Sequence, residues 1–275
     1  MQFQEWASKN LKHRYLSLSD RLVEEEIADE CTVPFVPYVG ANYCDAKPKI
    51  LIIGKATYGW GKGDGGQQGS GTLNDVLDKN DHDLWKYLVG LPEEFIEGEV
   101  IPYYGGEKRG PARAFWRRIY QLSGKLLMHH PVADYKREQQ RSEEVFRSIA
   151  WSNVFKVGAL KSEGGNPNKA LRDIQKEENK KEGNAFEEEI SALQPDVAIF
   201  STGPSYDKHI EDLLDRSVKD VDPKHLKKGV DPDHLKIKEI EGLDILAFRT
   251  YHFQASYYSN DRFEQVVDYI CDRVN

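Results

Sequence analysis

Apolar residues along this chain gather in four short aliphatic runs, and each run is followed at once by small or polar residues. The runs occupy residues 49–53, 149–155, 196–200 and 245–248, and longer amphipathic stretches separate them. Short β-branched runs of this kind are typical of strands that are buried on both faces of a parallel sheet. Alternation of strands and helices indicates an α/β fold with right-handed crossovers. The sequence therefore predicts a central parallel four-stranded sheet flanked by helices.

Helical periodicity accounts for most of the residues between the runs. Two helices are predicted within residues 3–30, and the second of them is predicted to begin at Ser19-Asp20. Further helices are predicted at 72–89, from Pro111 onward, at 133–147, at 166–193 and at 205–215, and the helix at 166–193 is expected to break at Gly183. A final helix is predicted to begin with Asn260 as its N-cap. Proline suits the first helical position, and asparagine at an N-cap accepts a backbone hydrogen bond.

We expect a single domain over residues 1–275, with an N-terminal helical extension at 1–46 and an inserted excursion at 205–242. Within the excursion the hexapeptide at 222–227 is nearly repeated at 231–236. Two copies are too few for a repeat architecture, so the excursion is interpreted as a local hairpin or lid.

Composition narrows the class of protein. The chain has 275 residues, of which 39% are hydrophobic and 31% charged, and this balance suits one soluble domain. We find neither an apolar run of membrane-spanning length nor a signal peptide, so the sequence predicts a cytoplasmic protein without a membrane partner. Three scattered cysteines form neither a disulfide framework nor a metal spacing. We expect no metal and no cofactor.

Charge is uneven along the chain. The formal net charge of −8 disfavours a protein that coats nucleic acid. A basic cluster nevertheless occupies 108–118 and includes Arg113, Arg117 and Arg118, whereas acidic runs such as Glu187-Glu188-Glu189 lie elsewhere. We interpret such runs as solvated helix faces, and we expect the basic cluster to contact DNA if DNA binds.

Several well-known motifs are absent. The Walker A pattern fails because Ala56 stands where its first glycine should be and Gly63 where its serine or threonine should follow. Residues 61–66 match the dinucleotide fingerprint, but they begin well past the strand and open no helix. No Gly-x-Ser-x-Gly nucleophile elbow occurs, and the histidines lack metal-ligand grouping.

The loops after the four runs are the remaining candidates for a site. Ligands in open α/β sheets bind beyond the carboxyl ends of parallel strands, where these loops would meet. The loop segments are Gly54-Lys55-Ala56-Thr57-Tyr58, Trp151-Ser152-Asn153, Ser201-Thr202-Gly203-Pro204-Ser205 and Tyr251-His252-Phe253-Gln254-Ala255-Ser256.

Together with Arg113-Ala114-Phe115-Trp116, these segments resemble the uracil-DNA glycosylase superfamily, in the correct order, over roughly residues 48–275. The resemblance places Gly54 to Tyr58 in the family's first loop and Phe115 where an aromatic ring packs the flipped base. Asn153 falls at the strand-end asparagine that reads the base edge, and His252 in the late histidine loop. The resemblance thus implies a glycosylase that flips a nucleobase and hydrolyses its N-glycosidic bond, with DNA as the partner.

The residue roles implied by the resemblance have a chemical basis. An asparagine amide offers a donor and an acceptor to a pyrimidine edge, and a histidine can donate to the anion that forms on the leaving base. The implied catalytic residues are Asp64, Asn153 and His252. The implied base-binding residues are Gly54, Lys55, Ala56, Thr57, Tyr58, Phe115 and Asn153. Arg113, Arg117, Gly203, Ser205 and Ser256 would bind DNA, the small residues by letting backbone amides approach phosphates.

The chain also departs from the family pattern. Lys55, Ala56 and Thr57 stand where a water-positioning carboxylate is expected, so Asp64 is assigned that role, with Asp75 as a further candidate. Phe253 replaces the usual proline. These departures favour a substrate other than plain uracil, such as a modified pyrimidine in foreign or phage DNA.

Two other functions stay open from the sequence. One is a catalytically silent member that binds nucleic acid or a nucleotide at the same strand ends. The other is an unrelated α/β hydrolase or transferase acting on a small nucleotide. Each site residue also has a purely structural interpretation. Asn153 would cap the end of a strand, and His252 would be a structural histidine with its hydrogen bonds made inside the protein. Phe115 would be a core side chain and Asp64 a turn residue.

Overall fold

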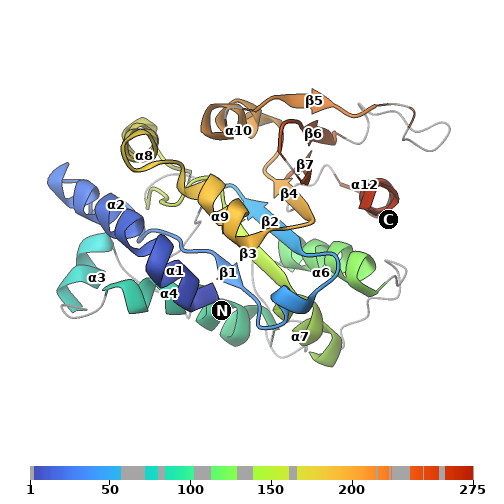
Figure 1. Cartoon of the computed structure of the whole chain (residues 1–275), viewed down its shortest axis with the longest axis horizontal. Helices are drawn as coiled ribbons and strands as arrows, with labels where there is room; N and C mark the ends of the chain where they lie inside the picture. Colours follow the sequence, from blue (N-terminus) through green and yellow to red (C-terminus); the bar gives the residue numbers. More distant parts are fainter. Residues whose placement is uncertain are drawn as a thin grey trace. The chain divides into compact units, whose positions relative to one another are not determined.

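A computed structural model describes most of the chain. The described residues are 3–56, 72–79, 84–101, 113–128, 139–160, 166–214, 216–222, 224, 236–243, 245–253 and 258–274. The four aliphatic runs form strands near their predicted positions (Figure 1): β2 (Ile50–Gly54), β3 (Ile149–Asn153), β4 (Val197–Ser201) and β7 (Leu246–Thr250). Every residue of β2, β3 and β4 is buried, as expected for strands covered on both faces.

The sheet is larger than predicted and mixed. Within the described residues it has seven strands in the order β1-β3-β2-β4-β7-β6-β5, including β1 (Tyr38–Val39), β5 (Val218–Asp220) and β6 (Lys238–Ile240). β2 pairs with β4 and β4 with β7 in parallel, whereas β6 is antiparallel to both β7 and β5. The three additional strands have only two or three residues each, too few to show an alternating pattern in the sequence.

The predicted excursion before the last strand contains the antiparallel pair β5–β6. Val218 pairs with Ile240 and Asp220 with Lys238, so the described residues on either side of the near-repeated segment are antiparallel strands. Most of the near-repeated hexapeptides (223 and 225–235) lies outside the described residues.

The chain divides into two compact units, each built from three separate segments. The first unit comprises Met1–Tyr38, Lys55–Glu99 and Ser152–Ala192, and the second comprises Val39–Gly54, Val100–Trp151 and Leu193–Asn275.

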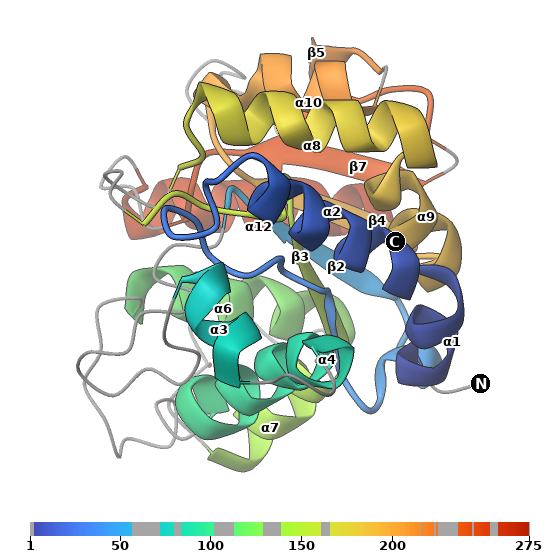
Figure 2. The ribbon, with the colours of Figure 1, turned by 90° about the vertical axis from the view of Figure 1, so that its left-hand side faces the viewer.

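Helices dominate the first unit. They are α1 (Phe3–Asn10), α2 (Lys12–Glu24), α3 (Leu73–Lys79), α4 (Leu84–Phe95), which continues into a π-helical turn (Ile96–Val100), α8 (Lys169–Glu182) and α9 (Ala185–Leu193). Figure 2 shows α2 lying against α8. The predicted break at Gly183 is confirmed, because this glycine adopts a φ of 89° between α8 and α9.

The second helix starts earlier than predicted. It begins at Lys12, so Ser19 lies inside it rather than at its N-terminus. The buried Ser19 hydroxyl donates to the carbonyl of Tyr15, at 2.9 Å, and this bond within the helix satisfies a residue that commonly acts as a cap. Leu11, Leu18 and Leu22 are also buried, so these N-terminal residues contribute to the core of the first unit.

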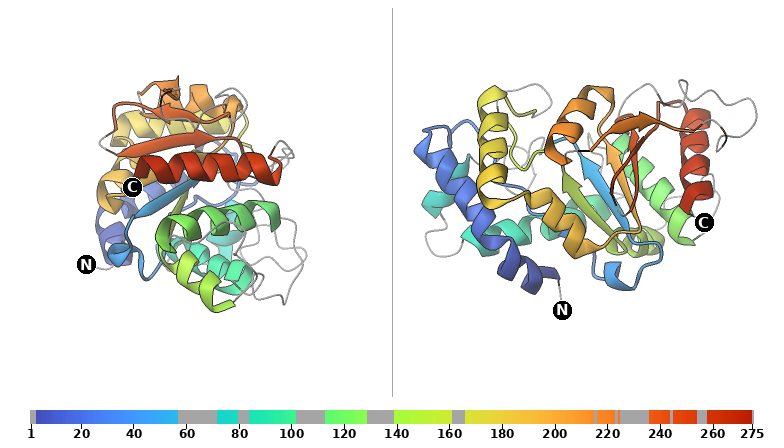
Figure 3. Two further views of the ribbon diagram at one scale, coloured as in Figure 1. Left: turned by 90° about the vertical axis from the view of Figure 1, so that its right-hand side faces the viewer. Right: turned by 45° about the horizontal axis from the view of Figure 1, so that its top comes forward.

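The second unit holds β2, β4, β7 and several helices. These are α6 (Arg113–Met128), α7 (Gln139–Arg147), α10 (Asp207–Leu214), α12 (Asn260–Val274) and short 3-10 turns at Tyr43–Asp45 and Pro204–Tyr206. Figure 3 shows α12 packed alongside α6. Ser259, and not Asn260, caps α12, because the Arg262 N–H donates to Ser259 Oγ at 3.3 Å. In the described part of the chain, no helix is long and apolar enough to cross a membrane.

Candidate strand-end site

In the second unit, three strands deliver their carboxyl ends to one edge of the sheet. Ile53 pairs with Phe200 and Ser201 pairs with Thr250, so the parallel strands β2, β4 and β7 end together. Gly203 follows β4 with a φ of 80°, a conformation that favours glycine. Its N–H donates to the Thr250 carbonyl at 2.9 Å. Within this unit, the chain after β4 is therefore bonded to the end of β7.

Two of the implied site residues contact each other at this edge. The rings of Phe115 and His252 are stacked, with centroids 5.3 Å apart and an interplanar angle of 19°. Phe115 is 8% exposed, and Trp116 meets it edge-to-face at 5.1 Å. Phe115 is thus packed in the interior of the unit, and one face of its ring supports the imidazole.

The backbone on both sides of His252 is hydrogen-bonded. The Tyr251 N–H donates to the Tyr258 hydroxyl at 2.9 Å, and the Phe253 N–H donates to Ser201 Oγ at 3.0 Å. Phe253 buries its ring completely. The backbone of Tyr251 and Phe253, on either side of His252, is therefore held in place.

In the first unit, Asn153 ends β3 with an unsatisfied polar group. The residue is 1% exposed, and its Nδ2 has no hydrogen-bond partner among the described residues. Next to it, the Phe155 N–H donates to the Lys55 carbonyl at 3.0 Å, so the chain after β3 is bonded to the chain after β2. Lys55 is half-buried, and desolvation lowers the pKa of its amine.

A buried polar network lies directly beside Asn153. Lys156 Nζ contacts Glu189 Oε2 and Ser152 Oγ, both at 2.7 Å, and Ser152 Oγ donates to Glu189 Oε2 at 2.8 Å. The Tyr15 hydroxyl donates to the other oxygen of Glu189. The carboxylate of Glu189 is 0% exposed and accepts from all three residues.

This network contradicts the prediction that the acidic run at 187–189 is a solvated face, and it also decides whether Ser152 is arranged as a nucleophile. The acidic run at 187–189 was expected to be a solvated face, but Glu189 faces the core, where Lys156 compensates its charge. Burial raises the pKa of Tyr15, with a further contribution from the charge of Glu189, and burial lowers the pKa of Lys156. Ser152 and Lys156 resemble a nucleophilic dyad, but the serine hydroxyl donates to the Glu189 carboxylate and the lysine is paired with the same carboxylate, which is not the arrangement of an activated nucleophile.

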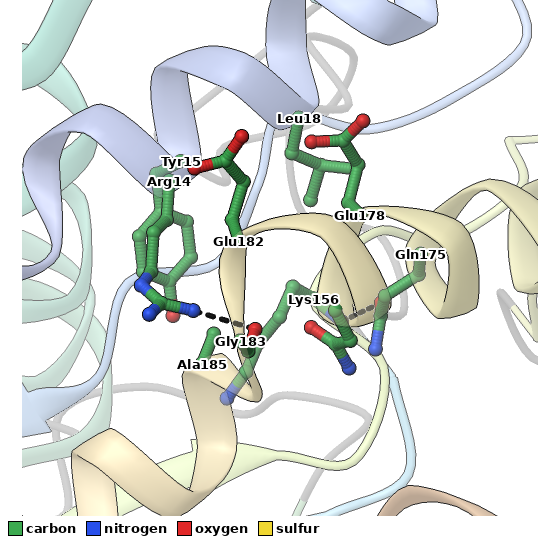
Figure 4. Close-up of a pocket in the computed structure, with 10 residues that line it drawn as sticks. Arg14, Tyr15, Leu18, Lys156, Gln175, Glu178, Glu182, Gly183 and Ala185 are labelled. Atoms are coloured by element: carbon green, nitrogen blue, oxygen red, sulfur yellow. Dashed lines mark hydrogen bonds between the residues drawn. The ribbon is translucent and has the colours of Figure 1, made fainter.

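A small cavity adjoins this network. It has a volume of about 20 Å³ and is lined by residues that include Arg14, Tyr15, Leu18, Lys156 and Gln175. Figure 4 shows Arg14 reaching the Gly183 carbonyl at its border. A space of this size holds one water molecule and is far too small for a nucleobase.

Other implied residues have separate surroundings. Arg117 is exposed on α6 and Ser205 is exposed after β4, whereas Gly203 is buried with its N–H already bonded. Asp75, a candidate acid, instead forms a reciprocal cap with Thr72 at the start of α3, with bonds of 2.8 and 3.0 Å. This structural bond explains Asp75 without a catalytic role.

Some of the implied residues lie outside the described part of the chain. These are Thr57, Tyr58, Asp64 and Ser256, together with the side chain of Arg113. Ala56 is half-buried at the end of the described first loop. No cluster of three or more His, Cys, Asp or Glu side chains suited to a metal occurs among the residues that the structure describes.

Comparisons of the chain with protein-family models, with curated proteins and with solved structures find no match.

Proposed function

We propose that the protein is a DNA glycosylase with a uracil-DNA glycosylase-like arrangement of β3, β2, β4 and β7. It flips a nucleobase out of DNA and hydrolyses the N-glycosidic bond. The proposed substrate is a modified pyrimidine of foreign or phage DNA, in preference to plain uracil. A cytoplasmic setting is part of the proposal, and the three free cysteines support it.

The buried, unsatisfied amide of Asn153 carries this proposal. A buried polar group without a partner costs about 1–3 kcal/mol, so such groups call for an explanation. A substrate that supplies the missing acceptor is one explanation, and a carbonyl oxygen on a pyrimidine edge is such an acceptor. The position of Asn153 at the carboxyl end of a central strand agrees with where α/β proteins bind ligands.

His252 is assigned to the leaving base. Cleavage of the glycosidic bond leaves negative charge on the base, and an imidazole N–H that donates to it lowers the barrier. The stacked Phe115 ring and the hydrogen-bonded backbone around His252 support a preorganised donor. Arg117, exposed on α6, is assigned to phosphate contact.

The test is base release from oligonucleotides. Purified protein is incubated with single- and double-stranded DNA bearing uracil or modified pyrimidines; mass spectrometry identifies freed base, and alkali reveals abasic sites. We expect release from at least one substrate, lost in the separate variants Asn153→Ala and His252→Ala. Release that persists in both folded variants would remove this mechanism.

A catalytically silent DNA-binding member is the second candidate. The described part of the first loop carries Lys55 and Ala56 where the family has a water-positioning carboxylate, and this substitution favours binding without hydrolysis. DNA binding with no base release from the whole panel, unaffected by Asp64→Asn, would select this alternative.

A further inference from the structure

Arg118 is a buried cation in the second unit that the proposed function does not use. The sequence groups it with a basic surface cluster, yet it is only 6% exposed. Its guanidinium donates through Nη1 to the Phe253 carbonyl and through Nη2 to the Tyr258 carbonyl. A buried side chain bonded to two backbone carbonyls is not available to a DNA phosphate, so a role other than DNA contact is required.

The two carbonyls belong to the loop that carries His252. The Phe253 carbonyl lies one residue after the histidine. The hydroxyl of Tyr258 accepts the N–H of Tyr251, the residue before the histidine, so Tyr258 also lies beside His252 in space. The guanidinium also lies over the rings of Tyr258 and Phe263, at 5.4 and 5.5 Å from their centroids. One side chain thus joins the chain after His252 to the chain that closes the loop.

The position of Arg118 on α6 adds a second connection. Phe115 lies three residues earlier, on the same face of the helix, and its ring stacks on the His252 imidazole. A single turn of α6 therefore contacts the histidine ring with one residue and the following backbone with the other. A guanidinium holds its donors in a rigid planar fork, so it fixes the spacing of two carbonyls in a way that a lysine cannot.

We propose that Arg118 is a positioning residue for His252: it clamps the Phe253 and Tyr258 carbonyls and thereby fixes the histidine against Phe115. This inference rests on the proposed glycosylase function for its kinetic consequence. Its structural part, the fixed conformation of the loop, is independent of that function.

The experiment compares Arg118→Lys and Arg118→Met with Lys125→Met. Lys125 is on the same helix and binds Asp268 on α12, so its variant also removes a cation that joins α6 to another element, and it has no bond to the described residues around His252. Amide hydrogen exchange of Tyr251 and Phe253 is measured in the folded proteins. Base release is measured as kcat and KM on the uracil- or modified-pyrimidine-containing oligonucleotide that the wild type cleaves.

We expect exchange at both amides to accelerate at least about tenfold in the Arg118 variants and to stay unchanged in Lys125→Met. We expect kcat to fall about 100-fold with KM nearly unchanged, because a displacement of about 1 Å is sufficient for such a loss. Exchange or kcat in Arg118→Lys equal to that of Lys125→Met overturns the proposal. If Arg118→Met does not fold, Arg118→Lys decides. If the wild type releases no base, the proposed function fails, and the exchange result alone decides whether Arg118 fixes the loop.

Discussion

Lys156 Nζ lies 2.7 Å from Glu189 Oε2, and both side chains are buried in the first unit. Lys156 follows β3 by three residues, whereas Glu189 belongs to α9, and the Tyr15 hydroxyl brings α2 to the same carboxylate. The ion pair therefore connects three elements that are far apart in the sequence. One member of the network, Ser152, directly precedes Asn153 in β3.

Removal of one partner of this ion pair should be strongly destabilising. Glu189→Gln leaves the Lys156 charge buried without its carboxylate, and we expect the free energy of unfolding to fall by about 3–5 kcal/mol. Urea denaturation measures this change. The double variant Lys156→Met with Glu189→Leu should recover most of the loss, because it leaves no unpaired charge in the core.

The exposed pair Lys169–Asp173 provides the control for this prediction. Its atoms are 2.5 Å apart, but both side chains are largely open to solvent, so Lys169→Ala should not change stability measurably. Equal losses of stability in Glu189→Gln and Lys169→Ala would show that the buried ion pair contributes no more to the free energy of unfolding than the exposed one.

Stability should decline at alkaline pH because of Cys31. Burial, with smaller contributions from the charges of Asp29 and Glu30, raises the pKa of this thiol from 9.0 to about 12. Between these values the unfolded chain loses the proton and the folded protein keeps it, so the stabilising effect present below pH 9 is lost progressively toward pH 12. By pH 10.5 the loss from this group is about 2 kcal/mol.

Urea denaturation under reducing conditions, repeated from pH 8 to 10.5, measures the slope. In Cys31→Ala the free energy of unfolding should fall less steeply with pH than in the wild type. The variant also loses a buried side chain, which lowers its stability at every pH but does not change this slope. Cys44→Ala, at an exposed cysteine, should keep the wild-type slope. A wild-type slope in Cys31→Ala would contradict the assignment.

Asn153→Leu should separate stability from activity. Leucine has nearly the shape of asparagine and removes the unsatisfied buried Nδ2, so we expect stability to stay equal or rise by up to about 1–3 kcal/mol. Base release should be abolished, because the edge-reading donor and acceptor are gone. Thermal unfolding and the base-release assay together give the result; a large loss of stability would instead indicate a purely structural amide.

Arg117 should contribute to the salt dependence of DNA binding. Arg117→Glu removes one cationic contact, and the slope of log K against log salt should fall by about 1 or more. Lys208→Glu, at an exposed position on α10, makes the same change of charge and should leave the slope unaltered. Fluorescence anisotropy at several salt concentrations measures both; equal slopes in the two variants would remove α6 as a DNA-binding surface.

Sequence patterns predicted the elements whose signals are local. Residues 49–53 and 196–200 were predicted as strands because continuous apolar runs end there at small residues. The strands found at these places, Ile50–Gly54 and Val197–Ser201, have every residue buried. The break at Gly183 was predicted because glycine allows the positive φ that ends α8. The resemblance to a known family, and not periodicity, singled out Phe115 and His252 as site residues, but it did not predict that their rings stack on each other.

Long-range polar contacts gave no local signal. Glu189 stands in a run of three glutamates, and only its position on α9 shows that it faces Lys156 and Tyr15. Arg118 likewise stands in a basic cluster, and its two carbonyl partners lie 135 and 140 residues later. Burial of a charge depends on partners that fold beside it, so the residue type and its neighbours in the sequence do not determine it.

The segmented first unit also has a consequence for how the chain is made. Tyr15 and Glu189 are 174 residues apart, and the last segment of this unit begins only at Ser152. At a synthesis rate of about 5–20 residues per second, the ribosome delivers Glu189 about 10–35 s after Tyr15. During that interval the apolar face of α2 has no completed core to join. The nascent chain should therefore need protection from aggregation, for example by a chaperone, until α9 has emerged.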